Sequence, residues 1–237
     1  MKKHLGSSTV SLVSAIAITA FLGTSANAAD LPRPVHNPIV APIYNWTGCY
    51  GGANLGTAWG GGDMNAATGE SISGTATGFA GGLQLGCDYQ IGSFVIGARN
   101  LIDATSLSGG GTFGAGLLAG YSGNVHTTWF DALTVRAGYL MQPNWLLYAQ
   151  GGFAWSSSSQ TINNPAGVQV AQFSKNTGWT AGGGIEYMFT PRWTAFLEYN
   201  FMDFGTNTAN FTVGITPTSV SVHRTVQTVL VGFNYRF

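Results

Sequence analysis

The sequence predicts an all-β protein, an eight-stranded antiparallel β-barrel that crosses an outer membrane, with short turns at one end and four long loops at the other. Only 8% of its 237 residues are charged, where about 25% is usual for a soluble protein. After residue 29, no segment offers the roughly 18 consecutive apolar residues that a spanning helix needs. Glycine reaches 35 residues and aromatics 13%. Because lipid admits only helices and closed barrels, this exported, weakly charged chain is predicted to be a barrel.

Residues 1–29 have the features of a secretory signal peptide. Lys2 and Lys3 precede the apolar run VSLVSAIAITAFLG, and Ala26 and Ala28 provide an Ala-x-Ala cleavage site. An N-terminal membrane anchor is the alternative, although the run is too short to span a bilayer comfortably. Removing the signal leaves seven of the nine Lys and Arg against nine Asp and Glu, a net charge of −2. This balance predicts no nucleic-acid partner.

Residues 30–45 form a proline-rich leader, DLPRPVHNPIVAPIYN. Proline fixes φ and removes a hydrogen-bond donor, so the leader is expected to be an extended periplasmic tether rather than a strand. A disordered leader without a role is the alternative.

Eight segments then show the period-2 alternation of strands, and together they define a barrel domain over residues 46–237. Most have about 11–15 residues, which is enough for a tilted strand to cross a bilayer. They cover residues 46–59, 76–90, 94–104, 127–141, 145–156, 177–189, 193–204 and 225–237.

The connections between these segments alternate in length. Short connections are expected at 91–93, 142–144 and 190–192, and long ones at 60–75, 105–126, 157–176 and 205–224. Outer-membrane barrels have short periplasmic turns and longer external loops, whereas a soluble sandwich has no reason to alternate in this way.

Each strand has one apolar face and one face of small or polar residues. In 177–189, Trp179, Ile185 and Phe189 share a face, and Thr180 and Glu186 lie on the other. The interior of an eight-stranded barrel is narrow and must be filled by side chains. Small residues and paired charges suit that interior, so the apolar face is predicted to contact lipid.

The charged residues on the inward phase are expected to form an ion-pair and water network that fills the lumen, because buried charges need partners. They are Arg99, Arg136, Glu186, Glu198 and Arg236, with Asp88 and Asp103. A hydrolase using Glu186 and Glu198 is the enzymatic alternative. No accompanying nucleophile or inserted domain supports it, so no catalytic residue is predicted.

All seven tryptophans lie near the predicted strand ends, which indicates aromatic girdles at the two membrane interfaces. Trp46, Trp145 and Trp193 are beside the chain start or short turns, and Trp59, Trp129, Trp155 and Trp179 are beside the long loops.

Cys49 and Cys87 fall opposite each other on the first two strands, on the outward face. A periplasmic oxidant could join them. Directly opposed strand positions suit disulfide geometry poorly, so two small lipid-facing residues remain the alternative.

No cofactor or metal is predicted. GGGTFGAG at 109–116 matches G-x-G-x-x-G but lies in a long loop without a βαβ unit. The histidines share no metal-ligand spacing. His126 and His223, in or beside long loops, leave open a surface contact with a metal or haem.

Five stretches together resemble the alphaproteobacterial outer-membrane β-barrel family of porin-like or opacity-like surface proteins. They are YNWTGCYGGANLG, WFDALTVRAGYL, NWLLYAQGGFAW, GWTAGGGIEYMFTPRWTAFLEYNFMDFG and the terminal VGFNYRF. The resemblance covers residues 30–237. It implies a fold similar to the membrane domain of outer membrane protein A, immunogenic loops, and a terminal aromatic, Phe237 with Tyr235, read by the barrel-assembly machinery.

Three functions are therefore considered. The first is a structural surface protein of a Gram-negative outer membrane, which supports the envelope, displays its loops and performs no chemistry. The second is a receptor whose loops bind haemin or a host-surface ligand. The third is a channel for small solutes, although eight strands leave a filled interior rather than a pore.

Overall fold

The computed structural model describes residues 44–173 and 177–237. The predicted signal peptide and the leader up to residue 43 lie outside the described residues. None of the described residues forms a helix long and apolar enough to cross a membrane.

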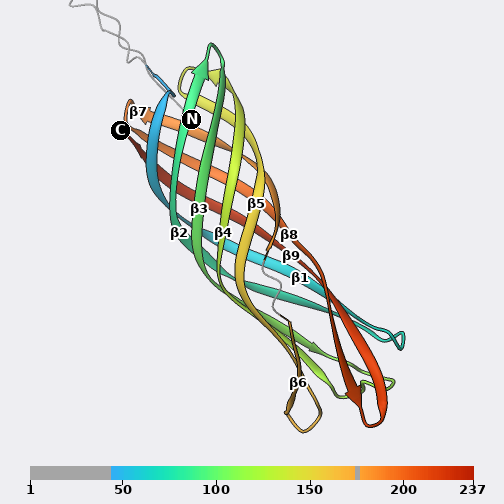
Figure 1. The fold of residues 1–237 in the computed structure, drawn as a ribbon. Helices are drawn as coiled ribbons and strands as arrows, with labels where there is room; N and C mark the ends of the chain where they lie inside the picture. The colour runs from blue at the N-terminus through green and yellow to red at the C-terminus, as the bar shows by residue number, and fades with distance from the viewer. Residues whose placement is uncertain (1–43, 174–176) are drawn as a thin grey trace, which may run out of the picture. The chain divides into compact units, whose positions relative to one another are not determined.

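The described chain forms one antiparallel sheet that closes on itself (Figure 1). The order of strands is β4-β3-β2-β1-β9-β8-β7-β5-β6, and an additional β4–β5 pairing joins the two sides. The strands are β1 (Gly48–Ala66), β2 (Ser71–Ile91), β3 (Phe94–Thr112), β4 (Ser122–Gln142), β5 (Trp145–Asn163), β6 (Gln169–Phe173), β7 (Thr177–Thr190), β8 (Trp193–Val213) and β9 (Thr216–Arg236).

The ring contains eight of these strands, which confirms the predicted fold class. First and last strands pair from Tyr50↔Arg236 to Ala66↔Val220, so the barrel has no open edge along β1. The one strand outside the ring is β6. It pairs only with the end of β5 that lies away from the short turns, from Gln160↔Phe173 to Asn163↔Gln169. Full closure satisfies the backbone groups that lipid cannot hydrogen-bond.

Seven of the eight ring strands extend beyond the predicted ones at the end opposite the short turns, whereas β7 begins at Thr177 as predicted. Most residues of the expected long loops are strand, and the remaining connections at that end include 67–70, 113–121 and 214–215. The expected loops are therefore largely β-hairpins. In β9, nine residues from Thr216 to Arg224 extend the sheet, a rise of roughly 20 Å at typical strand rise and tilt.

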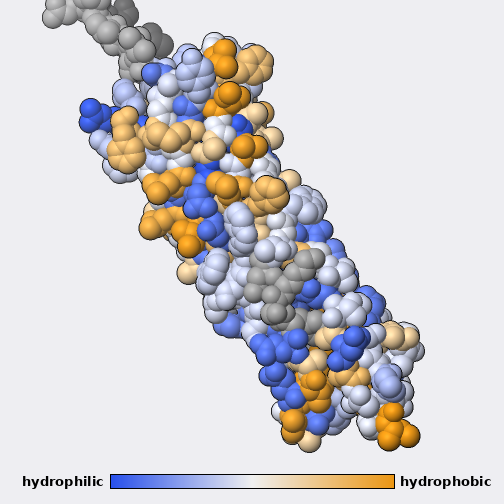
Figure 2. All heavy atoms as spheres, viewed as in Figure 1, coloured by the Kyte–Doolittle hydropathy of each residue, from blue (hydrophilic) through white to orange (hydrophobic). Residues whose placement is uncertain are grey.

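The outer surface changes character part-way along the barrel (Figure 2). From the short turns to about the middle of the strands it is apolar: Phe79, Val135 and Phe153 are 75%, 69% and 68% exposed. On the hairpin extensions the outward positions are mostly Ser, Thr, Asn and Gly, such as Thr208 and Ser159. We call the apolar part the belt and the polar part the tower. The belt is the lipid-facing face that the sequence predicted.

Three irregularities in the strand pairing lie where the belt meets the tower. Register shifts occur at Ala104/Leu107, Thr127/Trp129 and Asp203/Thr206. The third contains Gly205, whose φ of 66° is a conformation that glycine adopts without steric cost. A bulge adds an unpaired residue and reverses the alternation of faces. As a result, outward positions in β8 switch from odd-numbered residues to even-numbered ones.

Candidate functional site

The barrel interior is the natural place to look for a site, and its short-turn mouth is closed by Trp46. This residue precedes β1 and is 0% exposed. Its backbone N–H donates to Gln90 Oε1 and its indole N–H to Pro143 O, both at 3.0 Å. Val95, Leu146 and Met188 pack around it. The prediction that Trp46 belongs to an outward girdle is therefore wrong, because the segment before β1 folds into the mouth instead of continuing the strand.

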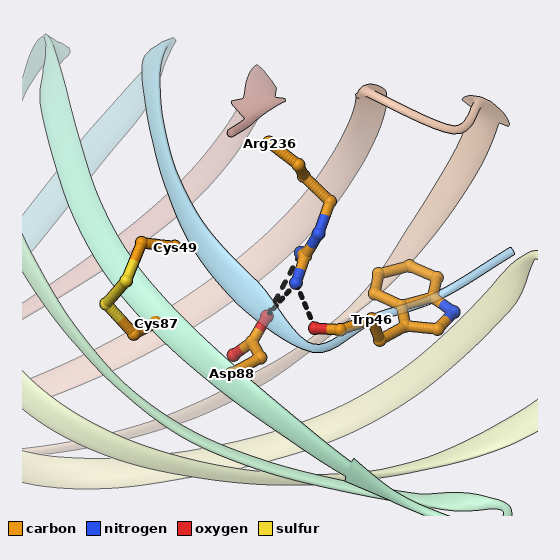
Figure 3. The surroundings of a disulfide bond; sticks show 5 residues. All are labelled: Trp46, Cys49, Cys87, Asp88 and Arg236. Atoms are coloured by element: carbon orange, nitrogen blue, oxygen red, sulfur yellow. Dashed lines mark hydrogen bonds and ion pairs between the residues drawn. A yellow bond between two sulfur atoms is a disulfide. The ribbon is translucent and has the colours of Figure 1, made fainter.

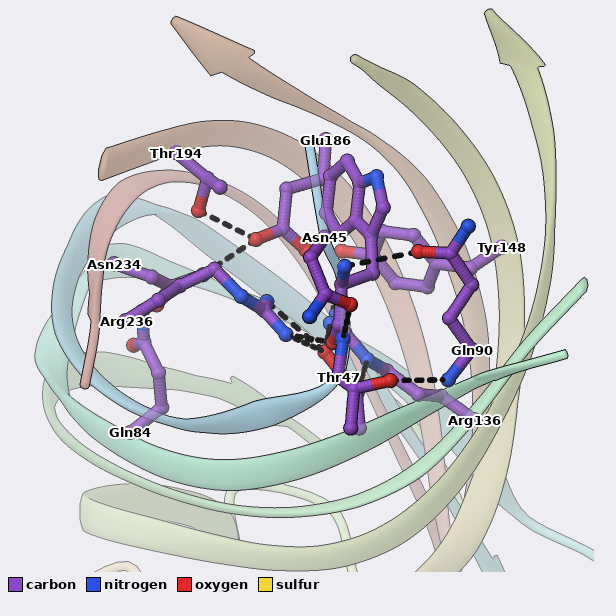
Figure 4. Close-up of polar contacts among 12 residues, drawn as sticks. Asn45, Thr47, Gln84, Gln90, Arg136, Tyr148, Glu186, Thr194, Asn234 and Arg236 are labelled. Carbon is purple, nitrogen blue, oxygen red and sulfur yellow. Dashed lines mark hydrogen bonds and ion pairs between the residues drawn. The ribbon is translucent and has the colours of Figure 1, made fainter. Parts of the chain in front are cut away.

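Above this plug, Arg136 lies between two buried carboxylates. Its Nη2 is 2.5 Å from Asp88 Oδ2 and its Nη1 is 2.8 Å from Glu186 Oε2. Arg236 also reaches Asp88, at 3.1 Å, and donates to the main-chain oxygen of Trp46 (Figure 3). Thr194 and Asn234 donate to the remaining oxygen of Glu186 (Figure 4). Every carboxylate in this cluster is thus neutralised and hydrogen-bonded.

A second ion pair continues the network along the lumen. Arg99 Nη2 lies 2.6 Å from Glu198 Oε1, and the Tyr148 hydroxyl donates to Glu198 Oε2 at 2.6 Å. The Tyr148 ring also faces Arg136, whose guanidinium carbon is 5.0 Å from the ring centroid. Asp103, by contrast, has no cation partner among the described residues and accepts a hydrogen bond from Asn54.

The structure thus brings together the seven charged residues expected in the lumen, six of them in ion pairs. Sequence reasoning missed the amides that connect them. Asn54 donates to Gln84, Gln84 to Asn234, and Asn234 to Glu186. The period-2 alternation places all three amides on the inward phase, so the same pattern could have found them.

Beyond the polar network, two apolar clusters fill the rest of the interior. The first includes Leu101, Phe130, Phe196 and Met202. The second, inside the tower, includes Met64, Phe113, Leu118, Ile162, Val220 and Val222. Side chains therefore obstruct the lumen at both ends and in the middle.

Glu186 and Glu198 do not have the arrangement that a hydrolase needs. Each is paired with its own arginine, and both are almost completely buried, at 0% and 1% exposure. A general acid and a general base must instead reach a substrate and a water.

The other six tryptophans lie outside the lumen. Trp145 and Trp193 are near the short turns, where they contact Tyr187 and Tyr235, with ring centroids 4.7 Å and 5.1 Å apart. Trp59, Trp129, Trp155 and Trp179 lie where the belt meets the tower, at the level of the bulges. Interfacial tryptophans favour this position between lipid and water.

Cys49 and Cys87 are joined by a disulfide on the outer face of β1 and β2 (Figure 3). They are direct cross-strand partners with Cα atoms 3.9 Å apart. The terminal residue is nearby, because the Phe237 N–H donates to Cys49 O at 3.0 Å. The disulfide thus lies next to the place where β1 pairs with β9 and closes the ring.

His126 and His223 both point outward on the tower, on β4 and β9. These strands occupy opposite positions in the ring, so the two histidines cannot hold one haem iron between them. His223 lies 3.5 Å from Asp203. Within the described residues, no group of three or more His, Cys, Asp or Glu side chains could hold a metal ion.

Glu70, in the β1–β2 turn, ties two hairpins together. Its carboxylate accepts hydrogen bonds from the Thr68 hydroxyl and from the Leu117 N–H in the β3–β4 connection. The Thr68 hydrogen bond, with the contacts from Leu117 and Leu118, holds the pKa of Glu70 below its usual value of 4.5. The contact therefore stabilises the hairpin tips above that value and is lost as pH falls through the lowered pKa.

This predicts an acid transition confined to the tips. The Leu117 amide resonance of the refolded protein is expected to titrate with a midpoint below pH 4.5, and Glu70→Gln is expected to remove the titration. A midpoint at or above that pH would show that these hydrogen bonds do not stabilise the charged carboxylate of Glu70.

A closed ring with an apolar belt, interfacial tryptophans and a filled interior defines the class of transmembrane outer-membrane barrels. A family model described as "Outer membrane protein beta-barrel domain" matches residues 16–237. The chain belongs to this family, and it is an outer-membrane protein. Short turns then face the periplasm, and the tower faces the exterior.

The chain is similar to proteins named for their immunogenicity. It is 31% identical over 237 residues to the 31 kDa outer-membrane immunogenic protein of Brucella melitensis biotype 1, covering 93% of this chain and 97% of that protein. It is 29% identical over 221 residues to the 25 kDa outer-membrane immunogenic protein of Brucella abortus biovar 1, covering 92% and 91%. Neither relative is named as an enzyme.

A solved structure shares the fold. The outer membrane protein OprG from Pseudomonas aeruginosa aligns with a TM-score of 0.50 at 13% identity, covering 83% of this chain and 99% of that one.

Proposed function

We propose that this protein is a structural component of the outer membrane, which supports the envelope and displays rigid hairpins at the surface without catalysis. The observation that carries this proposal is the filled lumen. Trp46, the ion-pair network and the two apolar clusters each obstruct it. Eight-stranded barrels generally have an interior that side chains just fill.

Planar-bilayer recording tests the proposal against the channel alternative. The refolded barrel is expected to show no reproducible single-channel steps, because buried side chains obstruct the lumen along its length. Large and uniform steps would overturn the structural function. A heat-modifiable band on unboiled gels would verify, in the same samples, that the barrel had folded.

Display of a surface ligand site is the second candidate, and the tower favours it. The hairpin tips expose apolar side chains to water, with Ile215 at 96% and Val168 at 59%. Side chains this exposed at the hairpin tips are available for contact with a partner. Haemin titration tests one such ligand. A saturable spectral shift lost in His126→Ala or in His223→Ala would support a receptor, and no shift would exclude haemin.

For the C-terminus we propose the role that the resemblance implies, recognition by the barrel-assembly machinery. The Phe237 ring is 80% exposed and contacts Tyr235, with centroids 5.6 Å apart. Phe237 thus exposes its aromatic ring where β1 pairs with β9, and the ring makes few contacts with the barrel interior. Deleting it should impair assembly in cells far more than refolding in detergent.

A further inference from the structure

One buried arginine in the tower lacks the partners that the other lumen arginines have. Arg224 on β9 faces inward and is 5% exposed. Its Nη2 donates to Ser156 Oγ at 2.5 Å, and its guanidinium carbon lies 4.1 Å from the centroid of the Phe204 ring. No described residue accepts a hydrogen bond from its Nε or its Nη1.

Arg99, Arg136 and Arg236, the other buried arginines of the lumen, do have carboxylate partners. Each of those arginines forms an ion pair with a buried carboxylate at 2.5–3.1 Å. Among the described residues, no carboxylate forms an ion pair with Arg224. A guanidinium stays charged in proteins and cannot escape burial by losing its proton. An unpaired buried charge costs several kcal/mol, so a counter-ion at this position would be strongly favoured.

A cavity lies next to Arg224 and is large enough for such an ion. Its volume is about 30 Å³. The space exists because inward positions of three adjacent strands lack side chains, among them Gly62, Gly74 and Gly111. A Cβ atom built on these residues would have its nearest neighbour 3.7, 3.8 and 3.5 Å away, so each position has room for a methyl group.

The location also suits an ion from water. Arg224 pairs with Gly62, three residues beyond Trp59 at the outer girdle, and therefore lies in the tower rather than in the belt. Met64 and Val222, of the outer apolar cluster, line the cavity on the side toward the hairpin tips. An ion can reach the cavity from the water around the tower or be enclosed while the barrel folds.

We propose that the tower contains a binding site for one small monovalent anion, of the size of chloride or nitrate, held by the unpaired guanidinium of Arg224 in the glycine-walled cavity. The free N–H groups of Arg224, on Nε and Nη1, lie on different edges of the guanidinium, so one of them donates a charge-assisted hydrogen bond to the ion. The mostly apolar walls favour a weakly hydrated anion over fluoride. This site does not depend on the proposed structural function of the barrel.

NMR of the refolded protein with arginine Nε labelled by ¹⁵N tests this site directly. Bromide serves as the probe and replaces fluoride at constant ionic strength, with refolding at each concentration. The Nε resonance of Arg224, assigned from its absence in Arg224→Met, is expected to shift saturably. Those of Arg99, Arg136 and Arg236 should stay in place. No shift, or a shift that never saturates, would overturn the proposal.

Cavity-filling variants separate the cavity from the arginine. Gly62→Ala combined with Gly74→Ala should weaken bromide binding at least about ten-fold, because the added methyl groups occupy the space of the ion. Gly61→Ala is the matched control, since its Cβ would point outward with its nearest neighbour 4.0 Å away. Unchanged binding in the double variant would place the ion elsewhere and refute the site.

Thermal unfolding provides a readout that does not require NMR. Bromide is expected to raise the melting temperature of the wild-type barrel relative to fluoride, and to leave that of Arg224→Met unchanged, since only a folded site with the arginine binds the ion. An equal rise in both proteins would indicate a general salt effect and contradict the proposal.

Discussion

Replacing Arg136 with methionine is expected to lower the free energy of unfolding by about 3–5 kcal/mol, the usual cost of removing one member of a buried ion pair. Arg136 contacts Asp88 at 2.5 Å and Glu186 at 2.8 Å, and its guanidinium carbon lies 5.0 Å from the ring centroids of Tyr50 and Tyr148. Methionine keeps much of the side-chain volume but leaves Glu186 without its cation. Urea-dependent unfolding of the refolded barrel, followed by tryptophan fluorescence, would measure the loss.

Arg192→Met provides the matched control for this prediction. Arg192 is exposed in the turn before β8, where its Nη1 donates to the Tyr235 hydroxyl at 3.2 Å. The same substitution should therefore change the free energy of unfolding by less than about 1 kcal/mol. Equal losses in the two variants would mean that the lumen ion pairs add nothing beyond an ordinary surface contact.

Replacing Trp46 with alanine is expected to destabilise the barrel by about 3–5 kcal/mol, as for other fully buried aromatic residues. The change removes the plug at the periplasmic mouth and the hydrogen bond to Pro143 O. It exposes the cluster of Val95, Leu146 and Met188 to water. The variant should nevertheless stay closed in planar bilayers, because the ion-pair network and both apolar clusters remain in the lumen.

Trp193→Ala is the comparison that distinguishes a plug from a girdle residue. Trp193 is 45% exposed on the belt and contacts mainly Tyr235. Its loss should cost about 1 kcal/mol, the size of one aromatic pair. If Trp46→Ala cost no more than this, the mouth would not depend on a packed tryptophan.

The belt is the part of this protein that sequence reasoning predicts well. Apolar and small or polar residues alternate strictly along its strands. Each residue faces either lipid or a narrow lumen, and each of these environments accepts only certain side chains. Glu186 and Arg136 fall on the inward phase for this reason, while Ile185 and Val135 fall on the outward phase. In the tower, water lies outside and apolar side chains lie inside, with Ser, Thr and Gly between them. Because this contrast is weaker, and because bulges such as the one at Asp203/Thr206 interrupt the alternation, the sequence pattern of these hairpins predicted loops.

The sequence by itself determined the eight-stranded barrel, the outward apolar face and the seven charges of the belt interior, because these follow from local alternation and from the need to pair buried charges. Only the tertiary structure decided which charges meet, since Arg136 contacts Asp88 and Glu186 from strands distant in sequence. The inward position of Trp46 also depends on the closed ring. The mouth that Trp46 fills is lined by side chains from several strands. The structure also leaves Arg224 beside an unfilled cavity, because glycines predicted to lie in the long loops 60–75 and 105–126 lie on inward strand positions instead.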